Sequence, residues 1–292
     1  MESVVDQPLP RWRRARTFGH TGRVIGAGLL VGVVLLCVFV PLLWPYGPNE
    51  IVAPAYQAPS WSHPFGTDTT GRDVFVRTFA GGRLDLAVAA FAIAVSCALG
   101  TAIGTAVALS RRRWVDTLTM RLIDGLIAFP FVVLILALIV VVGPGLELGP
   151  LPAGVPALLV SLLLVGWAIY ARLGRAEAQS LRQRDYVLAA ELLGYSRARV
   201  AVRHVLPEVW RITAAYAVAD VILVVVVMAG LAFLGAGVQP PTADWGQMMY
   251  EGRTVLATSW WITVLPGVVL VLTGLGVTLV ADSLLGARER GK

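Results

Sequence analysis

The sequence predicts an all-α integral membrane protein with six transmembrane helices, and two observations carry that prediction. Hydrophobic residues make up 57% of the 292 residues and charged residues only 14%, with a mean hydropathy of +0.74. A soluble domain carries about 25% charged residues, so most of this chain is expected to lie in lipid. A membrane-spanning helix needs about 20 predominantly apolar residues. Six charge-free intervals meet that length: 24–49, 86–110, 125–146, 148–171, 221–243 and 254–281.

Turn-forming residues set the expected ends of several of these helices. Pro45 follows the first apolar segment, so the first helix is expected over 24–44. A cleaved signal peptide is the alternative, but its apolar core would be about 20 residues long instead of about 7–15, which favours a retained helix. The fifth helix is expected to begin just after Pro207 and to end before Pro240-Pro241.

The basic residues predict how the helices cross the membrane. With six spans both chain ends share one side, and 20 of the 24 basic residues fall on that side. Cytoplasmic loops carry an excess of arginine and lysine, so both termini are expected in the cytoplasm. The map that follows has a cytoplasmic arm over 1–23, a first helix over 24–44, an external connection over 45–85, a core of five helices over 86–284 that includes a cytoplasmic loop over 175–207, and a cytoplasmic tail over 285–292.

Composition also excludes several kinds of site. The only lysine is Lys292, so the chain lacks the lysine of a phosphate-binding P-loop, and any ATP that drives it must be hydrolysed by a partner. Cys37 and Cys97 lie in apolar stretches and are expected to act as small hydrophobic residues. The three histidines have no metal-ligand spacing, and the His-Glu-x-x-His pattern of an intramembrane metalloprotease is absent. The basic residues lie between apolar runs, so nucleic-acid binding is not expected.

Residues 185–207 predict a helix–turn–helix elbow at the cytoplasmic surface. The segment up to Leu193 is rich in helix formers, and Gly194 stands where a left-handed residue would end that helix. Ser196 is then expected to cap a second short helix, and Pro207 fits the first turn of the fifth span. Taken alone, the arginines of this elbow predict contact with anionic lipid headgroups.

The same segment resembles the EAA loop of bacterial ABC importer permeases. That loop is written Glu-Ala-Ala, three residues, Gly, nine residues, an apolar position, any residue and Leu-Pro. Here Leu188-Ala189-Ala190 is followed by Gly194, His204 and Leu206-Pro207 at the same spacing. Leu188 replaces the glutamate and His204 occupies the apolar position, and both departures resemble peptide-type members of the family.

Two predicted external segments resemble dipeptide, oligopeptide and nickel permeases, and the N-terminal arm resembles their C-type subunit. The first segment runs from His63 to Arg77, and the second contains Pro240-Pro241 and Trp245. Two roles stay open for them. One is a loop scaffold in which Asp68 and Asp73 cap a helix or pair with Arg72 and Arg77. The other is contact with a binding protein through Phe65, Gly66, Asp68, Arg72, Asp73, Pro240, Pro241 and Trp245.

The resemblance implies the ABC type I importer permease fold in a bacterial inner membrane. It also implies a machine of two permease chains, two P-loop ATPases and an extracytoplasmic substrate-binding protein or lipoprotein. ATP and Mg²⁺ would be bound by the ATPases, and this chain would hold no cofactor or metal. Arginines of the elbow would pair with acidic groups of the ATPase or touch lipid. The implied ATPase-coupling residues are Leu188, Ala189, Ala190, Glu191, Gly194, Arg197, Arg199, Arg203, His204, Leu206 and Pro207.

Asp220 and Met228 are the candidates for the translocation path. An acid inside a membrane span is a functional candidate, and the alternative for Asp220 is a hydrogen bond to the second permease. Met228 stands near the middle of the fifth span, where the resemblance leads us to expect an acid. The solute is expected to be a di- or oligopeptide, with nickel or another small solute as the alternative. A stand-alone secondary transporter is less favoured, because broken helices and repeated halves are not evident in the sequence.

Overall fold

The computed structural model describes residues 20–289 except 111, 144 and 147. The predicted cytoplasmic arm therefore lies almost entirely outside the described residues. Within them the regular structure is helical, with two isolated β-bridges and no strand. The α-helices are α1 (His20–Leu43), α2 (Val74–Leu109), α3 (Arg113–Ile127), α4 (Phe131–Val142), α5 (Val155–Leu181), α6 (Asp185–Leu192), α7 (Arg197–Val200), α8 (Leu206–Phe233), α9 (Trp245–Gly252) and α10 (Trp261–Glu289).

Five helical segments in the described part of the chain are long and apolar enough to cross a membrane. They are α1, α2, α5, α10 and the helical run over 197–233 that contains α8. A sixth span arises if α3 and α4 are taken as one broken helix, since the two meet at a bend of 93°. The prediction of six spans therefore fits the fold, but the prediction that the third span is one unbroken helix over 125–146 is wrong.

The bend between α3 and α4 has a local cause. Pro130 lacks the amide hydrogen that a continuing helix would need, and it disfavours helical geometry at Phe129. Before the bend, α3 begins at Arg113, where the chain is charged and mostly exposed. The search for charge-free intervals did not find this helix, because an amphipathic surface helix carries charges along its length. A broken helix, which the sequence did not reveal, is therefore part of this fold.

Helix α2 begins at Val74, twelve residues before the predicted start at 86. We predicted a start at 86 because Asp85 and nearby Arg77 are charged, and charged residues were not expected inside a membrane helix. In the structure Asp85 and Arg77 are only 2% and 1% exposed, and each has partners from other segments. The connection between α1 and α2 is therefore shorter than the predicted 45–85, because it ends at Asp73, the N-cap of α2.

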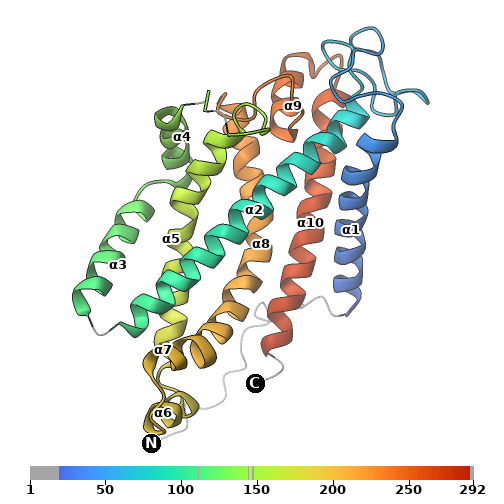
Figure 1. The fold of residues 1–292 in the computed structure, drawn as a ribbon. Coiled ribbons are helices and arrows are strands. Elements are labelled where there is room, and N and C mark those ends of the chain that lie inside the picture. Colours follow the sequence, from blue (N-terminus) through green and yellow to red (C-terminus); the bar gives the residue numbers. More distant parts are fainter. Residues whose placement is uncertain (1–19, 111, 144, 147, 290–292) are drawn as a thin grey trace, which may run out of the picture.

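Glycines let α2 cross α5 at close range. Figure 1 shows α2 running diagonally across α5 and α8. A Cβ atom on Gly100 would lie 2.3 Å from the Trp167 carbonyl oxygen, and one on Gly104 would lie 2.1 Å from the Ala171 carbonyl oxygen. Neither site has room for a side chain, so the two backbones touch. Small residues spaced in this way are a common basis of helix packing in membranes.

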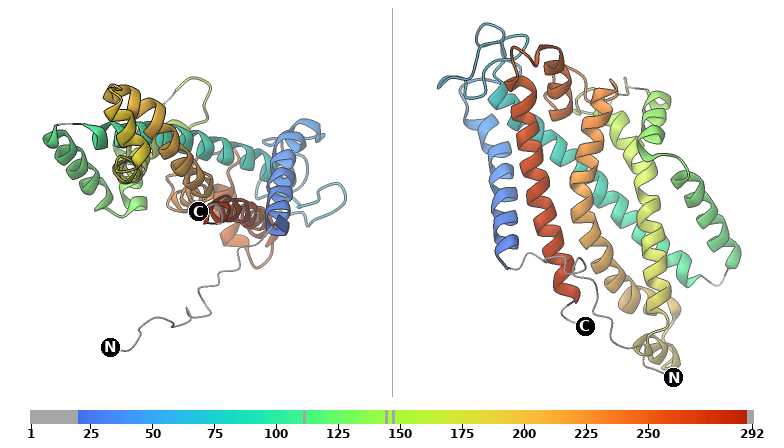
Figure 2. Two further views of the ribbon diagram at one scale, coloured as in Figure 1. Left: turned by 90° about the horizontal axis from the view of Figure 1, so that it is seen from below. Right: turned by 180° about the vertical axis from the view of Figure 1, so that it is seen from behind.

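The two ends of the bundle carry different structures. Helices α6 and α7 lie at one end, together with the start of α1 and the last turns of α10 (Figures 1 and 2). The loop before α2 and helix α9 lie at the other end (Figure 1). The elbow and the described ends of the two terminal helices therefore share one side of the bundle, as six spans require.

Candidate functional site

The elbow forms as the sequence predicts. Helix α6 ends at Leu192, and Gly194 adopts a left-handed φ of +80°. The amide of Tyr195 donates to the Ala190 carbonyl oxygen at 3.2 Å, which closes the turn. The Ser196 hydroxyl then accepts from the Arg199 amide at 3.4 Å, as an N-cap does. The predicted roles of Gly194 and Ser196 in the local geometry are confirmed.

The second arm of the elbow continues into α8 without a break. Helix α7 passes through a π-turn over Ala201–Val205 and joins α8 at Leu206. The amide of Leu206 donates to the Ala201 carbonyl oxygen, the wider spacing of a π-turn. This widening accommodates Pro207, which has no amide hydrogen and would crowd an ordinary turn. Helix α8 begins at Leu206 with Pro207 in its first turn, which agrees with the prediction to within two residues. The sequence did not predict that the helical run extends back to 197.

One face of the elbow is fixed to the rest of the chain. Val187 and Ala190 from α6 are buried with Val200 and Val205, against the ends of α2 and α5. The prediction that Ala190 approaches a partner surface is wrong, because this chain's own residues cover it. Ala189, its neighbour, is exposed. The elbow is thus attached to three long helices through one small apolar cluster.

The opposite face of the elbow presents apolar side chains to the outside. Leu192 is 89% exposed and Leu193 is 75% exposed, next to exposed Leu188. Exposed apolar patches on a protein surface often mark interaction sites. Sequence reasoning missed Leu192 and Leu193 because leucine before a helix-ending glycine fits a buried helix end equally well. The side chain of Glu191, another predicted coupling residue, lies outside the described residues.

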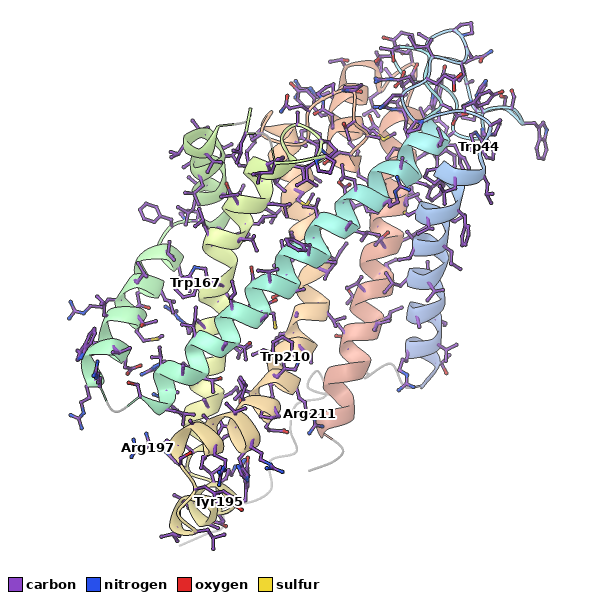
Figure 3. The ribbon with its side chains drawn as sticks, viewed as in Figure 1. Trp44, Trp167, Tyr195, Arg197, Trp210 and Arg211 are labelled. Atoms are coloured by element: carbon purple, nitrogen blue, oxygen red, sulfur yellow. The ribbon has the colours of Figure 1, made fainter. Side chains whose placement is uncertain are left out.

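The arginines of the elbow carry uncompensated charge within the described chain. Arg197, Arg199 and Arg203 are exposed and form none of its ion pairs. Arg199 lies 5.3 Å from the centre of the Tyr195 ring. Figure 3 shows Tyr195 and Arg197 at this end of the bundle, with Trp210 and Arg211 further along α8. These charges are therefore free to meet anionic lipid or acidic protein groups.

A hollow of about 820 Å³ lies beside the elbow, where α6 faces the start of α8. Its lining is mostly polar or charged. His204 reaches it, and the ring Nδ1 atom is buried without a hydrogen-bond partner among the described residues. The lining residues are Leu181, Arg184, Asp185, Tyr186, Arg203, His204, Pro207 and Glu208. The elbow end thus combines exposed leucines, free arginines and a polar hollow.

At the other end of the bundle, a buried ionic network holds the loop before α2. Arg72 donates to Asp68 at 2.7 Å, and the Arg77 guanidinium lies 3.4 Å from the same carboxylate. Asp73 caps α2 by accepting from the amides of Phe75 and Val76. Burial acts to raise the pKa of Asp68, but amide hydrogen bonds from Arg72 and Thr70 and the Arg72 charge outweigh it and hold that pKa below its usual value.

This network favours the scaffold role for the loop residues. Asp68, Arg72, Asp73 and Trp245 are between 0% and 8% exposed. The prediction that these four side chains contact a binding protein is wrong for the chain as folded, because other parts of the chain surround them. Trp245 instead donates from its ring nitrogen to the Thr78 carbonyl oxygen at 2.7 Å.

Gly66 also serves the loop rather than a partner. Its φ is +70°, and a Cβ atom would lie 2.7 Å from the ring nitrogen of Trp261. Phe65 is half-buried and packs edge-on against Phe75. Pro240 and Pro241 remain exposed at this end of the bundle and stay candidates for contact with a partner.

A second buried acidic contact joins α2 to α9. Asp85 accepts from the Trp245 amide at 3.0 Å, and its Oδ1 atom is buried without a hydrogen-bond partner among the described residues. Asp244, the residue before Trp245, caps α9 and is also buried. Burial raises the pKa of Asp244 above its usual value, although the hydrogen bond from the Gln247 amide opposes the shift.

Asp244→Asn is expected to raise thermal stability at pH 8, and the gain should shrink as the pH falls toward 5. A carboxyl group whose pKa is raised in the folded state binds more protons there, so folded stability falls as the pH rises through that pKa. An asparagine side chain carries no charge in this buried site at any pH, and its oxygen can still cap α9. Asp244→Ala is the control, and it should cost about 1 kcal/mol through loss of the cap. Unfolding midpoints of purified protein across this pH range measure both effects.

The middle of the bundle contains the two candidates for the translocation path. The Tyr170 hydroxyl donates to Asp220 Oδ2 at 2.6 Å, from α5 to α8. Asp220 thus has a hydrogen-bond partner within this chain, and the predicted alternative, a hydrogen bond to a second permease, stays a prediction. Met228 is 1% exposed and packs in the main apolar core, so the prediction that it lines a path is wrong.

Two ion pairs tie α5 to α3. Asp124 of α3 pairs with Arg172 of α5. Arg175 pairs with Asp116, which ties α5 to α3 at a second point.

Comparison with known proteins identifies the family. Residues 100–291 match the family described as binding-protein-dependent transport system inner membrane component. The chain belongs to this permease family. Residues 11–59 match the N-terminal transmembrane domain of oligopeptide transport permease C. The resemblance to ABC importer permeases is confirmed, and the chain is a multi-pass protein of the bacterial inner membrane.

Relatives of this permease extend over nearly its whole length. A protein of Brucella suis biovar 1 named as a peptide permease is 36% identical over 290 residues, which cover 98% of this chain and 93% of the relative. A protein of Brucella abortus biovar 1 named as a peptide transport system permease is 36% identical over 92% of this chain and 88% of its own length. The dipeptide transport system permease protein of Alkalihalophilus pseudofirmus is 31% identical over 91% of this chain and 84% of its own length.

Proposed function

We propose that this chain is the non-catalytic translocation subunit of an importer for di- and oligopeptides. It would act with a second permease, two ATPases and an extracytoplasmic binding protein. The family and the names of the relatives support this assignment. ATP and Mg²⁺ would be bound by the ATPases, because the only lysine of this chain is Lys292 and a P-loop cannot form.

The elbow is the observation that carries this proposal. Its exposed leucines and arginines suit a partner with an apolar groove bordered by acidic groups. Its buried face joins the ends of α2, α5 and α8. A partner that holds Leu192 and Leu193 would therefore pull on three transmembrane helices at once. Twenty of the 24 basic residues fall on the elbow's side of the predicted map, which favours a cytoplasmic elbow.

The mechanical consequence is a rigid-body movement. Closure of two ATPases on nucleotide would bring the elbows of two permeases together. Because one helical rod runs from 197 to 233, displacement at Arg197 is passed along α8 without a flexible joint. The bend between α3 and α4 offers a place where the remaining helices can adjust. The central pathway would thus open to one side of the membrane or the other, depending on the nucleotide bound to the ATPases.

Reconstitution tests the proposed function. The chain is co-expressed with its proposed partners, a second permease and two ATPases, purified, and placed in liposomes with ATP inside. We expect uptake of tritiated alanyl-phenylalanine only when the loaded binding protein is outside and ATP is present. The control is this chain alone in liposomes. Uptake by the chain alone, without ATP, would identify a secondary transporter and contradict the proposal.

A further inference from the structure

A cavity of about 540 Å³ lies between α2, α5, α8 and the turn that joins α3 to α4. Pockets that hold small molecules have volumes of roughly 300–1,000 Å³, so this one is large enough for a small solute. Its wall is almost entirely apolar, with side chains such as Ile93, Phe129, Ile169 and Val224. Among the described residues that line it, Asp220 is the only charged one.

The carboxylate of Asp220 has a positioning partner but no counter-charge. Its one hydrogen bond within the described chain comes from the neutral Tyr170 hydroxyl. The ion pairs of the described residues do not include Asp220. An acid at the centre of a membrane helix costs about 2.5–3.5 kcal/mol on insertion scales, and such residues mark substrate or ion pathways. The second oxygen, Oδ1, is therefore free to accept a cationic donor.

The surroundings select among possible cations. A divalent metal ion prefers several oxygen, nitrogen or sulfur ligands, and the described residues contain no group of three or more His, Cys, Asp or Glu side chains that could hold one. An ammonium group needs only one carboxylate for a charge-assisted hydrogen bond. The apolar wall around it suits side chains of different sizes. The combination fits a solute with one ammonium group and a variable apolar part.

We infer that Asp220, positioned by Tyr170, binds the α-ammonium group of the peptide as it passes through this cavity. The inference rests on the proposed function and names the group that the path recognises. Asp220 lies near the middle of α8, beside the α3–α4 bend. Leu223 and Phe129 on the cavity wall are 56% and 60% exposed in this chain, so the cavity is open on one side for entry and release. A single ionic contact holds the solute without trapping it.

Substitution of the acid tests the inference in the reconstituted transporter. With saturating loaded binding protein, Asp220→Asn is expected to lower the maximal rate of alanyl-phenylalanine uptake about tenfold or more, the effect of losing one ionic hydrogen bond. Asp220→Glu should restore part of the rate. Tyr170→Phe should fall between wild type and Asp220→Asn. ATP hydrolysis stimulated by the loaded binding protein should change less than about twofold, since the elbow is intact.

Met228→Leu is the matched control. It lies on the same helix, faces the core and should leave uptake unchanged. Wild-type uptake by Asp220→Asn would overturn the inference while the proposed function stands, and would show that Tyr170 and Asp220 form a purely structural bond. Failure of the wild-type complex to take up peptide would instead contradict the proposed function.

A photocrosslink keeps the inference testable if Asp220→Asn does not assemble. Para-benzoylphenylalanine replaces Ile169, which lines the cavity on α5, in a chain that keeps Asp220. Irradiation during ATP-driven uptake is expected to attach tritiated peptide to this chain. The same replacement at Val202, an exposed residue of the elbow, is the control and should attach none. If the photoreactive residue at position 169 attaches only to the second permease, a helix of that permease fills the cavity and the inference is overturned.

Discussion

Gly194→Val is expected to lower ATP-driven peptide uptake about tenfold or more while the transporter still assembles, a change of about 1.4 kcal/mol or more in coupling. The φ of Gly194 is +80°, and no heavy atom lies within 4 Å of a Cβ atom built there. Space therefore permits the valine, but its backbone conformation does not, because a β-branched residue is strongly disfavoured in the left-handed region. The turn would rearrange and displace α6 from α7.

Two variants separate the backbone effect from the effect of size. Gly194→Asn should keep most of the uptake, since asparagine tolerates left-handed geometry. Gly230→Ala adds a methyl group to α8, where nothing lies within 4 Å and φ is not positive, and should be nearly neutral. The measurement is uptake together with ATP hydrolysis stimulated by the loaded binding protein. If both survive in Gly194→Val, the elbow does not couple the ATPases to transport.

Arg77→Met is expected to destabilise the end of the bundle opposite the elbow by about 3 kcal/mol, because it leaves polar groups buried without a partner. The Arg77 guanidinium donates to the Pro48 carbonyl oxygen at 3.0 Å, the Asn49 side chain at 3.1 Å and the Pro241 carbonyl oxygen at 3.3 Å. It also lies beside Asp68. One side chain thus joins the loop after α1, the start of α2 and the loop before α9.

Thermal unfolding of purified protein measures this loss, with an expected decrease of at least about 5 °C in the midpoint. Arg83→Met is the matched control, since Arg83 lies on the same helix, is exposed and forms none of the described ion pairs. The control should change the midpoint by less than about 1 °C. Equal midpoints for Arg77→Met and Arg83→Met would show that the buried network does not stabilise the fold.

Local features of the elbow could be predicted because their physical causes are local. Gly194 is needed wherever a helix must end in a left-handed residue, and Ser196 supplies an oxygen to the amide of Arg199 three residues later. Both requirements act within a few residues and leave a readable pattern. The continuation of α7 into α8 was missed because Pro207 usually starts a helix, and the π-turn that accommodates it has no comparable pattern.

Charged residues caused the errors at the end of the bundle opposite the elbow. Asp68, Asp73 and Trp245 were candidates for contact with a partner, yet other segments of the chain bury them. Charge alone does not reveal whether a residue lies in solvent or in a buried network. The partners of Arg77 include Pro241, far along the chain, so the pattern around Arg77 contains no trace of the contact. The late predicted start of α2 follows from the same cause.

The pattern of residues was enough to predict a multi-span helical membrane protein with an elbow of the permease type, because lipid requires long apolar segments and a tight turn requires glycine. The folded arrangement was needed to find that α3 and α4 meet at a sharp bend, that Met228 faces the core and that Tyr170 positions Asp220 beside a cavity. These outcomes depend on which helix faces which. Apolar helices offer similar surfaces on every side, so their facing is fixed by packing across the whole bundle.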